Sequence, residues 1–287
     1  MSTVLGSSQY GKAETRLVLV RRDTAGHELV DLNVSIALAG DQADTHLRGD
    51  NAKVIPTDTM KNTVYAFARE FGVEAIESFG LLLGRHFVDT QPAIARARVS
   101  IEEYGWRRLG PHSFARTGGG TRTAVVSCDA GAAWVVSGVR DLVLLNSTDS
   151  EFRGFATDRY TTLAETSDRI LATAVEASWR HARADGDWAE SFAGAQDALV
   201  DAFVTTHSRS LQQTLYAMGS AVLAARPELA EVRLALPNKH HFLVDLAPFG
   251  LDNPGQVFFA ADRPYGLIEG TVIRDDAAPP GLAWSLS

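Results

Sequence analysis

The chain has 287 residues, 45% hydrophobic and 22% charged, a globular composition that excludes disordered and fibrous classes. Its formal net charge is -8, from 27 Lys and Arg against 35 Asp and Glu, and an acidic chain without a basic stripe is a poor partner for nucleic acid. This length allows one large domain or two ordinary ones.

The beginning of the chain does not resemble a targeting segment. Residues 1–12 lack the apolar core of a signal peptide, and no stretch approaches the ~18 uninterrupted apolar residues of a membrane span. We therefore expect a cytoplasmic protein without a membrane contact. The single cysteine, Cys128, excludes an internal disulfide and lies in an apolar-rich stretch, so we interpret it as a small buried hydrophobe.

The first half of the chain alternates between two periodicities. Every second residue is apolar in the strand-like segments, which begin with a hairpin around a turn at 23–26, and apolar residues recur at helical spacing between them. The expected elements are strands Lys12–Arg22 and His27–Leu38, helices Met60–Glu70 and Val73–Phe87, and strands Ala95–Tyr104 and Arg122–Val136.

The second half repeats this order. The expected elements are strands Leu142–Asn146 and Ile170–His181, a helical region from Trp188 to about Ala225, and strands Arg233–Leu246 and Gln256–Ile273. The helical region is too long for one ordinary helix. Weak helix formers and capping residues at 205–208 predict a break, with a new helix beginning near Ser208–Ser210.

This repeat predicts an α+β fold of two units, 1–138 and 139–287, each with an antiparallel sheet covered by helices on one face. Such a sheet leaves its other face and its edges without partners. Association of the units into a closed, oligomeric β-barrel is therefore expected.

Metal and phosphate sites have little support. Gly118–Gly120 lacks the lysine and the spacing of a phosphate loop and indicates a turn. In a strand over 236–246, side chains alternate, so Asn238 and His240 share a face while His241 takes the other, and the two histidines are poorly placed to bind one metal. The remaining histidines are scattered, without zinc-site spacing: His27, His46, His86, His112, His181 and His207. We predict no bound metal or organic cofactor.

Three segments of the chain resemble urate oxidase: VIPTDTMKNTVYAFA at 54–68, SEFRGFATDRYTTLAETSDRILAT at 150–173 and LPNKHHFLVDL at 236–246. Shorter matches are QYGK at 9–12, SLQQTLYAM at 210–218 and FAADRPYGLI at 259–268, so the resemblance runs over nearly the whole chain in the family's order. It implies two tandem tunnelling-fold (T-fold) units, with dimers closing a barrel and two barrels stacking into a homotetramer around a tunnel.

Departures from the family are confined to positions outside these motif residues. They are Gln91–Ala93, the glycine-rich Thr117–Thr121, and Ala174, where many relatives carry an acidic residue. The chain ends Trp-Ser-Leu-Ser and lacks a peroxisomal tripeptide, which suggests a cytosolic, bacterial-type protein.

Urate is a flat, electron-rich anion, and a site for it should offer a stacking face, a planar cationic fork and an amide. The resemblance implies that Phe152 stacks on the ring while Arg169 and Gln212 clamp its pyrimidine edge, which a guanidinium matches with two parallel hydrogen bonds. The main-chain N–H of Leu211, at the start of a predicted helix, could hold a urate oxygen. Taken singly, Phe152 and Leu211 could be core residues and Arg169 half of a surface ion pair.

Oxidation of urate begins with removal of a proton from the bound anion, and the resulting dianion can reduce oxygen without a metal or a flavin. The resemblance implies a base dyad of Lys12 and Thr57, with His240 as a third member of the proton relay. A lysine can serve as a base where it is desolvated or lies near other cations, and a histidine titrates near neutrality. A lone lysine on a strand is otherwise a solvated residue.

The resemblance also assigns the remaining contacts. Thr57 and Asp58 make backbone contacts to the imidazole side of the ligand, and Asn238 with Thr57 holds oxygen or the attacking water. Without the resemblance, Thr57 and Asp58 would be read as helix-cap residues.

In the family, Lys12, Thr57 and Asp58 come from one chain and the other site residues from its neighbour, so the active sites lie at subunit interfaces and urate and O2 are the substrates. Two alternatives remain. One is a hydrolase or aldolase acting on a pterin or another purine, because other tunnelling-fold proteins bind such rings. The other is a non-catalytic purine-binding or scaffold protein. The oxidase is favoured because stacking, clamp, relay and oxygen-pocket residues are all present at matching positions.

Overall fold

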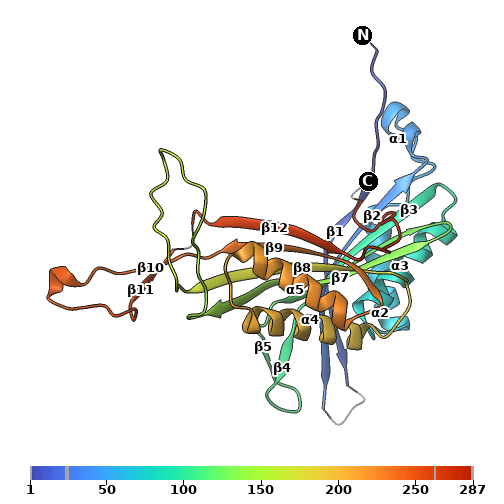
Figure 1. The fold of residues 1–287 in the computed structure, drawn as a ribbon. Helices are drawn as coiled ribbons and strands as arrows, with labels where there is room; N and C mark the ends of the chain where they lie inside the picture. Colours follow the sequence, from blue (N-terminus) through green and yellow to red (C-terminus); the bar gives the residue numbers. More distant parts are fainter. Residues whose placement is uncertain (1, 23–25, 262, 286–287) are drawn as a thin grey trace.

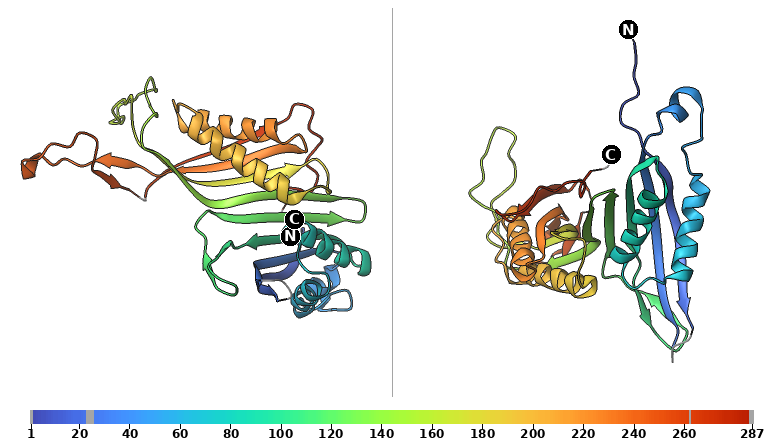
Figure 2. Two further views of the ribbon diagram at one scale, coloured as in Figure 1. Left: turned by 90° about the horizontal axis from the view of Figure 1, so that it is seen from below. Right: turned by 90° about the vertical axis from the view of Figure 1, so that its right-hand side faces the viewer.

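The computed structural model describes residues 2–22, 26–261 and 263–285. Its body is one sheet of eight strands in the order β1-β2-β3-β6-β7-β8-β9-β12, and every neighbouring pair is antiparallel (Figure 1). The long helices α2 to α5 pack over the strands of the half of the chain to which each belongs (Figure 2). The α+β class and the antiparallel sheet are confirmed.

The first half begins with the predicted hairpin. Its turn was expected at 23–26, of which residues 23–25 lie outside the described residues. The elements of this half are β1 (Tyr10–Arg21), β2 (Glu28–Gly40), α1 (Ala43–Arg48), α2 (Thr57–Glu70), α3 (Ile76–Thr90), β3 (Ile94–Glu103), β4 (Trp106–Arg108), β5 (Phe114–Arg116) and β6 (Thr121–Asp129). Helix α1 and the small β4–β5 hairpin were not predicted.

The second half repeats the order of the long elements. It contains β7 (Ala133–Asn146), β8 (Leu171–His181), α4 (Trp188–Thr205), α5 (Leu211–Ala225), β9 (Leu229–Asn238), β10 (His241–Leu243), the 3-10 helix η1 (Ala247–Phe249), β11 (Phe258–Ala260) and β12 (Gly266–Ile273). The predicted break between two helices is confirmed. Ser210 caps α5, and its hydroxyl accepts a hydrogen bond from the Gln213 N–H at 3.2 Å.

The expected single strand Arg122–Val136 is wrong, because it is two strands joined by a turn. The Asp129 side chain accepts hydrogen bonds from the N–H groups of Gly131 and Ala132, which turns the chain from β6 into β7. The predicted strand Leu142–Asn146 is not separate but forms the end of β7. A bulge at 140–141 separates it from the start of that strand, and Asp141 has a φ of 57° there.

The expected strands Arg233–Leu246 and Gln256–Ile273 are also wrong as continuous elements. Strand β9 ends at Asn238, close to where its neighbour β8 begins, and the chain leaves the main sheet. Strands β10 and β11 then pair only with each other, in an arm that projects from the body (Figure 1). The chain returns as β12 after Pro264, a residue that has no N–H to donate to a strand pair.

Two hydrophobic clusters lie between the helices and the sheet. One joins α2 and α3 to strands of the first half, and the other joins α4 and α5 to strands of the second half. The proposed boundary at 138/139 lies within β7, a strand that pairs with β6 on one side and β8 on the other. The two clusters therefore share one uninterrupted sheet.

A buried polar cluster joins the two halves. The Ser137 hydroxyl on β7 donates to Glu77 Oε1 on α3 at 2.6 Å and lies 2.9 Å from His181 Nε2 on β8. Arg122 on β6 donates to the other Glu77 oxygen at 2.8 Å. Burial lowers the pKa of His181 to about 4, so its ring is neutral at neutral pH.

The burial of His181 predicts acid-sensitive stability. An unfolded histidine takes up a proton near its ordinary pKa of about 6.5, whereas the folded one does so only near 4. The unfolded state therefore binds more protons between these values, and the free energy of unfolding falls by on the order of 3 kcal/mol as pH drops from 6.5 to 4.

We expect His181→Gln, which keeps an amide donor toward Ser137, to remove most of this pH dependence. Urea unfolding midpoints measured every half pH unit from 7 to 4 test it. The exposed His112→Gln is the matched control and should follow the wild type. An unchanged pH dependence in His181→Gln would contradict the prediction.

Candidate functional site

A cavity of about 670 Å³ opens at the end of the second half where β8 begins and β9 ends. Its lining includes Phe152, Arg169, Asn238 and His240, which are four of the predicted site residues. Its size lies within the usual range for small-molecule sites. The structure thus brings together a stacking ring, a guanidinium, an amide and an imidazole that are far apart in sequence.

Phe152 reaches the cavity at the end of the segment 147–152, in which Ser150 and Phe152 each form a single bridge to another segment. Its N–H donates to the Thr166 carbonyl at 2.9 Å, and the Thr166 N–H returns a bond to the Phe152 carbonyl at 3.0 Å. The two ends of the loop 153–165 are therefore closed by a backbone pair. The Phe152 ring stacks on Phe155 with centroids 5.0 Å apart and planes 14° apart.

Asp168, the residue that precedes Arg169, is hydrogen-bonded to the same segment. Its carboxylate accepts hydrogen bonds from the Thr148 hydroxyl at 2.9 and 3.0 Å and from the Asp149 N–H at 3.0 Å. The segments before and after the loop 153–165 are thus joined by the Asp168 carboxylate as well as by the Phe152–Thr166 backbone pair. Hydrogen bonds to an ionised group are the stronger kind.

Arg169 lies beside Phe152 with its guanidinium carbon 5.3 Å from the ring centroid. Its Nε donates to the Ser150 hydroxyl at 3.4 Å, a long hydrogen bond. Burial lowers the pKa of Arg169, yet an arginine keeps its charge in proteins. Such a half-buried, charged fork beside an aromatic face can bind the edge of a flat anion.

His240 lies just beyond the end of β9, and its ring stacks on Phe242 with centroids 5.8 Å apart. Burial lowers the pKa of His240, and Arg169 and His241 add to this shift. A neutral imidazole can accept a proton at one nitrogen and donate one at the other. The expected continuous strand over 236–246 is wrong, because β9 ends at Asn238 and β10 begins at His241. Asn238 and His240 line the same cavity as predicted, but His241 lines it as well.

Leu211 and Gln212 are the first two residues of α5 and lie outside the lining of this cavity. Leu211 is buried and Gln212 exposed. The turn before them pairs with the 147–152 segment, because the Glu151 N–H donates to the Ser208 carbonyl at 2.7 Å and the Ser208 N–H to the Asp149 carbonyl at 3.1 Å. The N-terminus of α5, with N–H groups that lack intrahelical acceptors, is thereby held next to Phe152's segment.

Lys12, Thr57 and Asp58 form a separate group in the first half. Lys12 on β1 lies opposite Ile36 on β2, and the Ile36 side chain packs in the core beneath the helices. Thr57 and Asp58 are the first two residues of α2, which covers the same face of the sheet. The Lys61 ammonium lowers the pKa of the Asp58 carboxyl, and Lys12 is near enough to contribute. A β-bulge follows Lys12 directly, where Glu14 has a φ of 56° and donates its N–H to the Ser35 hydroxyl at 2.9 Å. Bulges of this kind re-aim a neighbouring side chain.

The two groups are not assembled within one chain. Lys12 is on β1 at one edge of the sheet and Asn238 on β9, six strands further along the order. At the usual spacing between strands, that is a path on the order of 30 Å along the sheet. A ligand held by the second-half cavity does not reach Lys12 of the same chain.

The remaining expectations concern the cysteine, metal sites and membrane spans. Cys128 is buried in the core, and burial raises the pKa of its thiol to about 11, which makes it a poor nucleophile. No group of three or more His, Cys, Asp or Glu side chains within 2–22, 26–261 and 263–285 could hold a metal ion. No helix in the described part of the chain is both long and apolar enough to cross a membrane.

Sequence reasoning missed the polar residues that hold the cavity wall. Ser150, Asp168 and His207 all contact the 147–152 segment or Arg169. Ser150 and Asp168 lie inside the recognised 150–173 motif, which was the available signal. His207 had none, since it contacts Asp149, a residue 58 positions away.

The chain is similar in sequence and in fold to known uricases. The chain matches a family model described as Uricase over residues 8–127 and 135–269, ranges that contain every predicted site residue. It is 50% identical over 284 residues to a protein named Uricase from Arthrobacter globiformis, with 98% of this chain and 94% of that protein covered. It is 37% identical over 283 residues to Uricase from Dictyostelium discoideum, with 96% and 98% covered. The crystal structure of uricase from Arthrobacter globiformis matches with a TM-score of 0.94 over 97% of this chain and 98% of that chain.

The role of Asp168 in fixing the loop base predicts a local change on substitution. Asp168→Ala leaves the Asp149 N–H without its side-chain acceptor, so we expect that amide to exchange its hydrogen about 10-fold faster, as for the loss of one charge-assisted hydrogen bond. Hydrogen exchange followed by mass spectrometry on peptides spanning 147–152 measures this. Asp158→Ala, whose carboxylate contacts only its own loop, is the control. Equal exchange in both variants would show that Asp168 does not hold the segment.

Proposed function

The chain belongs to the uricase family and acts as a urate oxidase, and from this premise we propose that its active site is completed by a second copy of the same chain. The observation that carries the proposal is the separation of the two groups of site residues. The proposed clamp residues Phe152 and Arg169 line the cavity, whereas the proposed base Lys12 lies on β1 at the far edge of the sheet. Two copies that bring one group against the other complete both sites.

In the proposed complex, urate enters the second-half cavity as an anion. Phe152 stacks on its ring, and the Arg169 guanidinium with the Gln212 amide binds the pyrimidine edge. The main-chain N–H of Leu211 meets a urate oxygen at the start of α5, where the helix dipole favours negative charge. The charge and the half-buried setting of Arg169 support this role, because a desolvated cation attracts an anion more strongly.

The partner copy supplies Lys12, Thr57 and Asp58. Lys12 with Thr57 removes a proton from bound urate, and His240 relays it. The neutral state favoured by the His240 surroundings supports a relay role. Asn238 and Thr57 hold oxygen and then water above the ring.

Electrons pass from the urate dianion to O2, and water adds to the oxidised ring. Urate, O2 and H2O thus give 5-hydroxyisourate and H2O2, with every atom accounted for. The substrate is itself the reductant, so the reaction calls for no metal or organic cofactor.

We further propose that the two halves, 1–138 and 139–287, are tandem T-fold units. The repeated order of long strands and helices supports this division. Exposed apolar side chains on β7, on the edge strand β12 and on the arm, among them Val143, Leu145, Leu267 and Phe242, support an assembly in which they are covered. In that assembly two chains close a barrel and two barrels stack into a homotetramer.

One assay tests the function. The protein is mixed with urate in air, and urate absorbance, oxygen uptake and peroxide release are followed together. Matched loss of urate and oxygen with release of peroxide is expected. Binding without turnover would favour a scaffold, turnover without oxygen uptake would favour a hydrolase, and loss of turnover on treatment with a chelator would contradict cofactor independence.

The division of roles predicts different effects for two substitutions. Lys12→Met removes the base but leaves the cavity intact, so kcat should fall by about 100-fold or more while urate binding is spared. Arg169→Ala removes the charged clamp, so KM should rise by about 10-fold or more. Steady-state kinetics and equilibrium binding of urate under anaerobic conditions measure both. Equal, mild effects of the two substitutions would refute the assignment.

The shared site predicts complementation between two impaired chains, measured at urate concentrations below the wild-type KM, where both variants turn over slowly. When Lys12→Met and Arg169→Ala chains assemble together, some sites take a wild-type Lys12 from one chain and a wild-type Arg169 from the other. In a dimer of the two variants, one of the two sites would be intact, so co-expressed chains purified by two different tags should recover up to about half of wild-type activity. Each variant assembled alone is the control. Failure of the mixed assembly to exceed both controls would place the whole site within one chain.

A further inference from the structure

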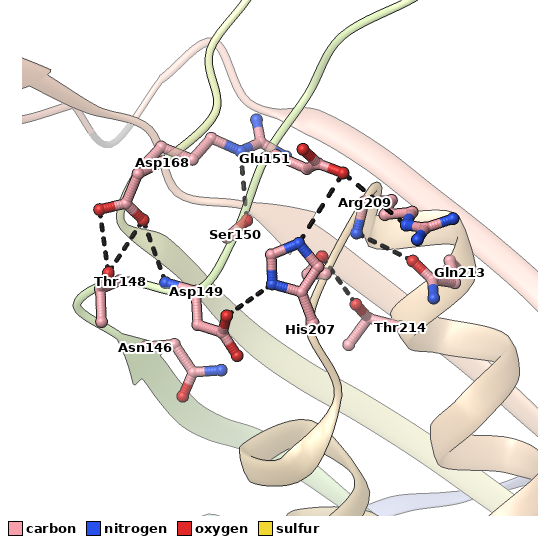
Figure 3. Close-up of polar contacts among 12 residues, drawn as sticks. Asn146, Thr148, Asp149, Ser150, Glu151, Asp168, His207, Arg209, Gln213 and Thr214 are labelled. Carbon is pink, nitrogen blue, oxygen red and sulfur yellow. Dashed lines mark hydrogen bonds and ion pairs between the residues drawn. The ribbon is translucent and has the colours of Figure 1, made fainter.

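The turn between α4 and α5 carries a histidine that none of the proposed catalytic steps uses. His207 Nδ1 lies 2.5 Å from Asp149 Oδ1, and its Nε2 lies 3.8 Å from Glu151 Oε1. Figure 3 shows the ring between the two carboxylates, at the side of the 147–152 segment. The imidazole therefore bridges two acidic residues of the segment that delivers Phe152 to the cavity.

The side chains of residues 149–152 make contacts on two different sides of the segment. Asp149 and Glu151 turn toward His207, whereas Ser150 accepts a hydrogen bond from Arg169 and Phe152 lies against the same guanidinium. Ser150 and Phe152 each pair with another backbone segment, so Glu151 between them points to the opposite side, and a contact that fixes Glu151 also fixes its two neighbours. His207 thus contacts the segment on the side that faces away from the cavity.

Two features show that this segment needs such support. Asp149 has a φ of 64°, in the left-handed region that residues with a side chain rarely adopt, so its conformation depends on its surroundings. The Glu151 carboxylate is nearly buried and two residues from Asp149, so the pair brings negative charges together on one face. Arg153 and Arg209 contact Glu151, and a charged His207 adds a cation that lies between the two carboxylates.

We propose that His207 is a positioning residue for the substrate clamp: in its charged form it locks residues 149–152 to the α4–α5 turn and so holds Phe152 and Arg169 ready for urate. This inference rests on the proposed function of the cavity. The same contact also holds the start of α5, at Leu211 and Gln212, beside the segment that carries Phe152.

The charge on His207 depends on pH in a defined direction. The hydrogen bond to Asp149 raises the pKa of His207, Glu151 raises it further, and partial burial and Arg209 oppose them. Two arginines also contact Glu151: Arg153 Nε at 2.9 Å and Arg209 Nε at 3.7 Å. Because the pKa is raised, the locked state is fully present in mild acid and is lost as pH rises through the folded value.

The test compares His207→Ala with the wild type in urate kinetics from pH 6 to about 9. At pH 6 we expect KM for urate to be roughly fivefold higher in the variant, the scale of one solvent-accessible charged pair, with kcat changed by less than about twofold. The ratio of the two KM values should approach one at about pH 9, where the wild-type ring has also lost its charge. Titrations that both proteins share cancel in this ratio.

Two further variants separate positioning from simple damage. His207→Gln keeps a hydrogen-bond donor without a charge, so its KM should lie between those of the wild type and His207→Ala. The exposed His112→Ala should leave KM unchanged at every pH. A ratio of KM values that is the same at all pH values, or a fall in kcat without a change in KM, would overturn the proposal.

A readout that does not depend on activity keeps this inference distinct from the proposed function. The Phe152 N–H, which donates to Thr166, should exchange its hydrogen faster in His207→Ala than in the wild type at pH 6. Unchanged exchange would overturn the positioning role. An inactive wild type in which His207→Ala still speeds exchange would instead overturn the urate oxidase assignment.

Discussion

The antiparallel pairing of β6 with β7 is the constraint on which the rest of the structure depends. It joins the two halves of the chain into one sheet, with eight residue pairs from Thr121↔Arg140 to Cys128↔Ala133. The buried Glu77–Ser137–His181 cluster closes the same junction from the helix side. Because β1 is an edge strand and β9 lies six places further along the sheet, the proposed sharing of one ligand between their residues calls for a contact between two chains.

The repeat inside the chain conserves backbone geometry more than chemistry. In β1 two residues, Ala13 and Glu14, oppose Ser35, and in β7 two residues, Arg140 and Asp141, oppose Glu176. The second residue of each pair has a φ near 57°. The residue before the first bulge is Lys12, the proposed base, whereas the residue before the second is Val139, a core side chain. The same kind of β-bulge thus follows the proposed base in one half and a core residue in the other.

The cavity of the second half is held mainly by polar contacts. Three pieces of chain, around 147–152, 166–169 and 206–210, are joined by backbone pairs and by the carboxylates of Asp149, Glu151 and Asp168. The cavity lining also includes apolar side chains such as Phe152, Leu163 and Phe258, but hydrogen bonds and ion pairs join these loops to one another.

Local patterns in the sequence by themselves determined the long helices, the first hairpin, the break between α4 and α5 and, through three recognised motifs, the family. Those features depend on residues within a few positions of one another, such as Ser210 and Gln213 at the cap of α5. Only the tertiary structure decided that Arg122–Val136 is a hairpin, that β9 stops at Asn238, and that Asp168 and His207 support the cavity. These depend on which distant segments meet, and a strand ends where its neighbour ends, whatever its own alternation continues to predict. Periodicity records the local preference of a chain, whereas pairing and polar contacts are set by partners far away in sequence.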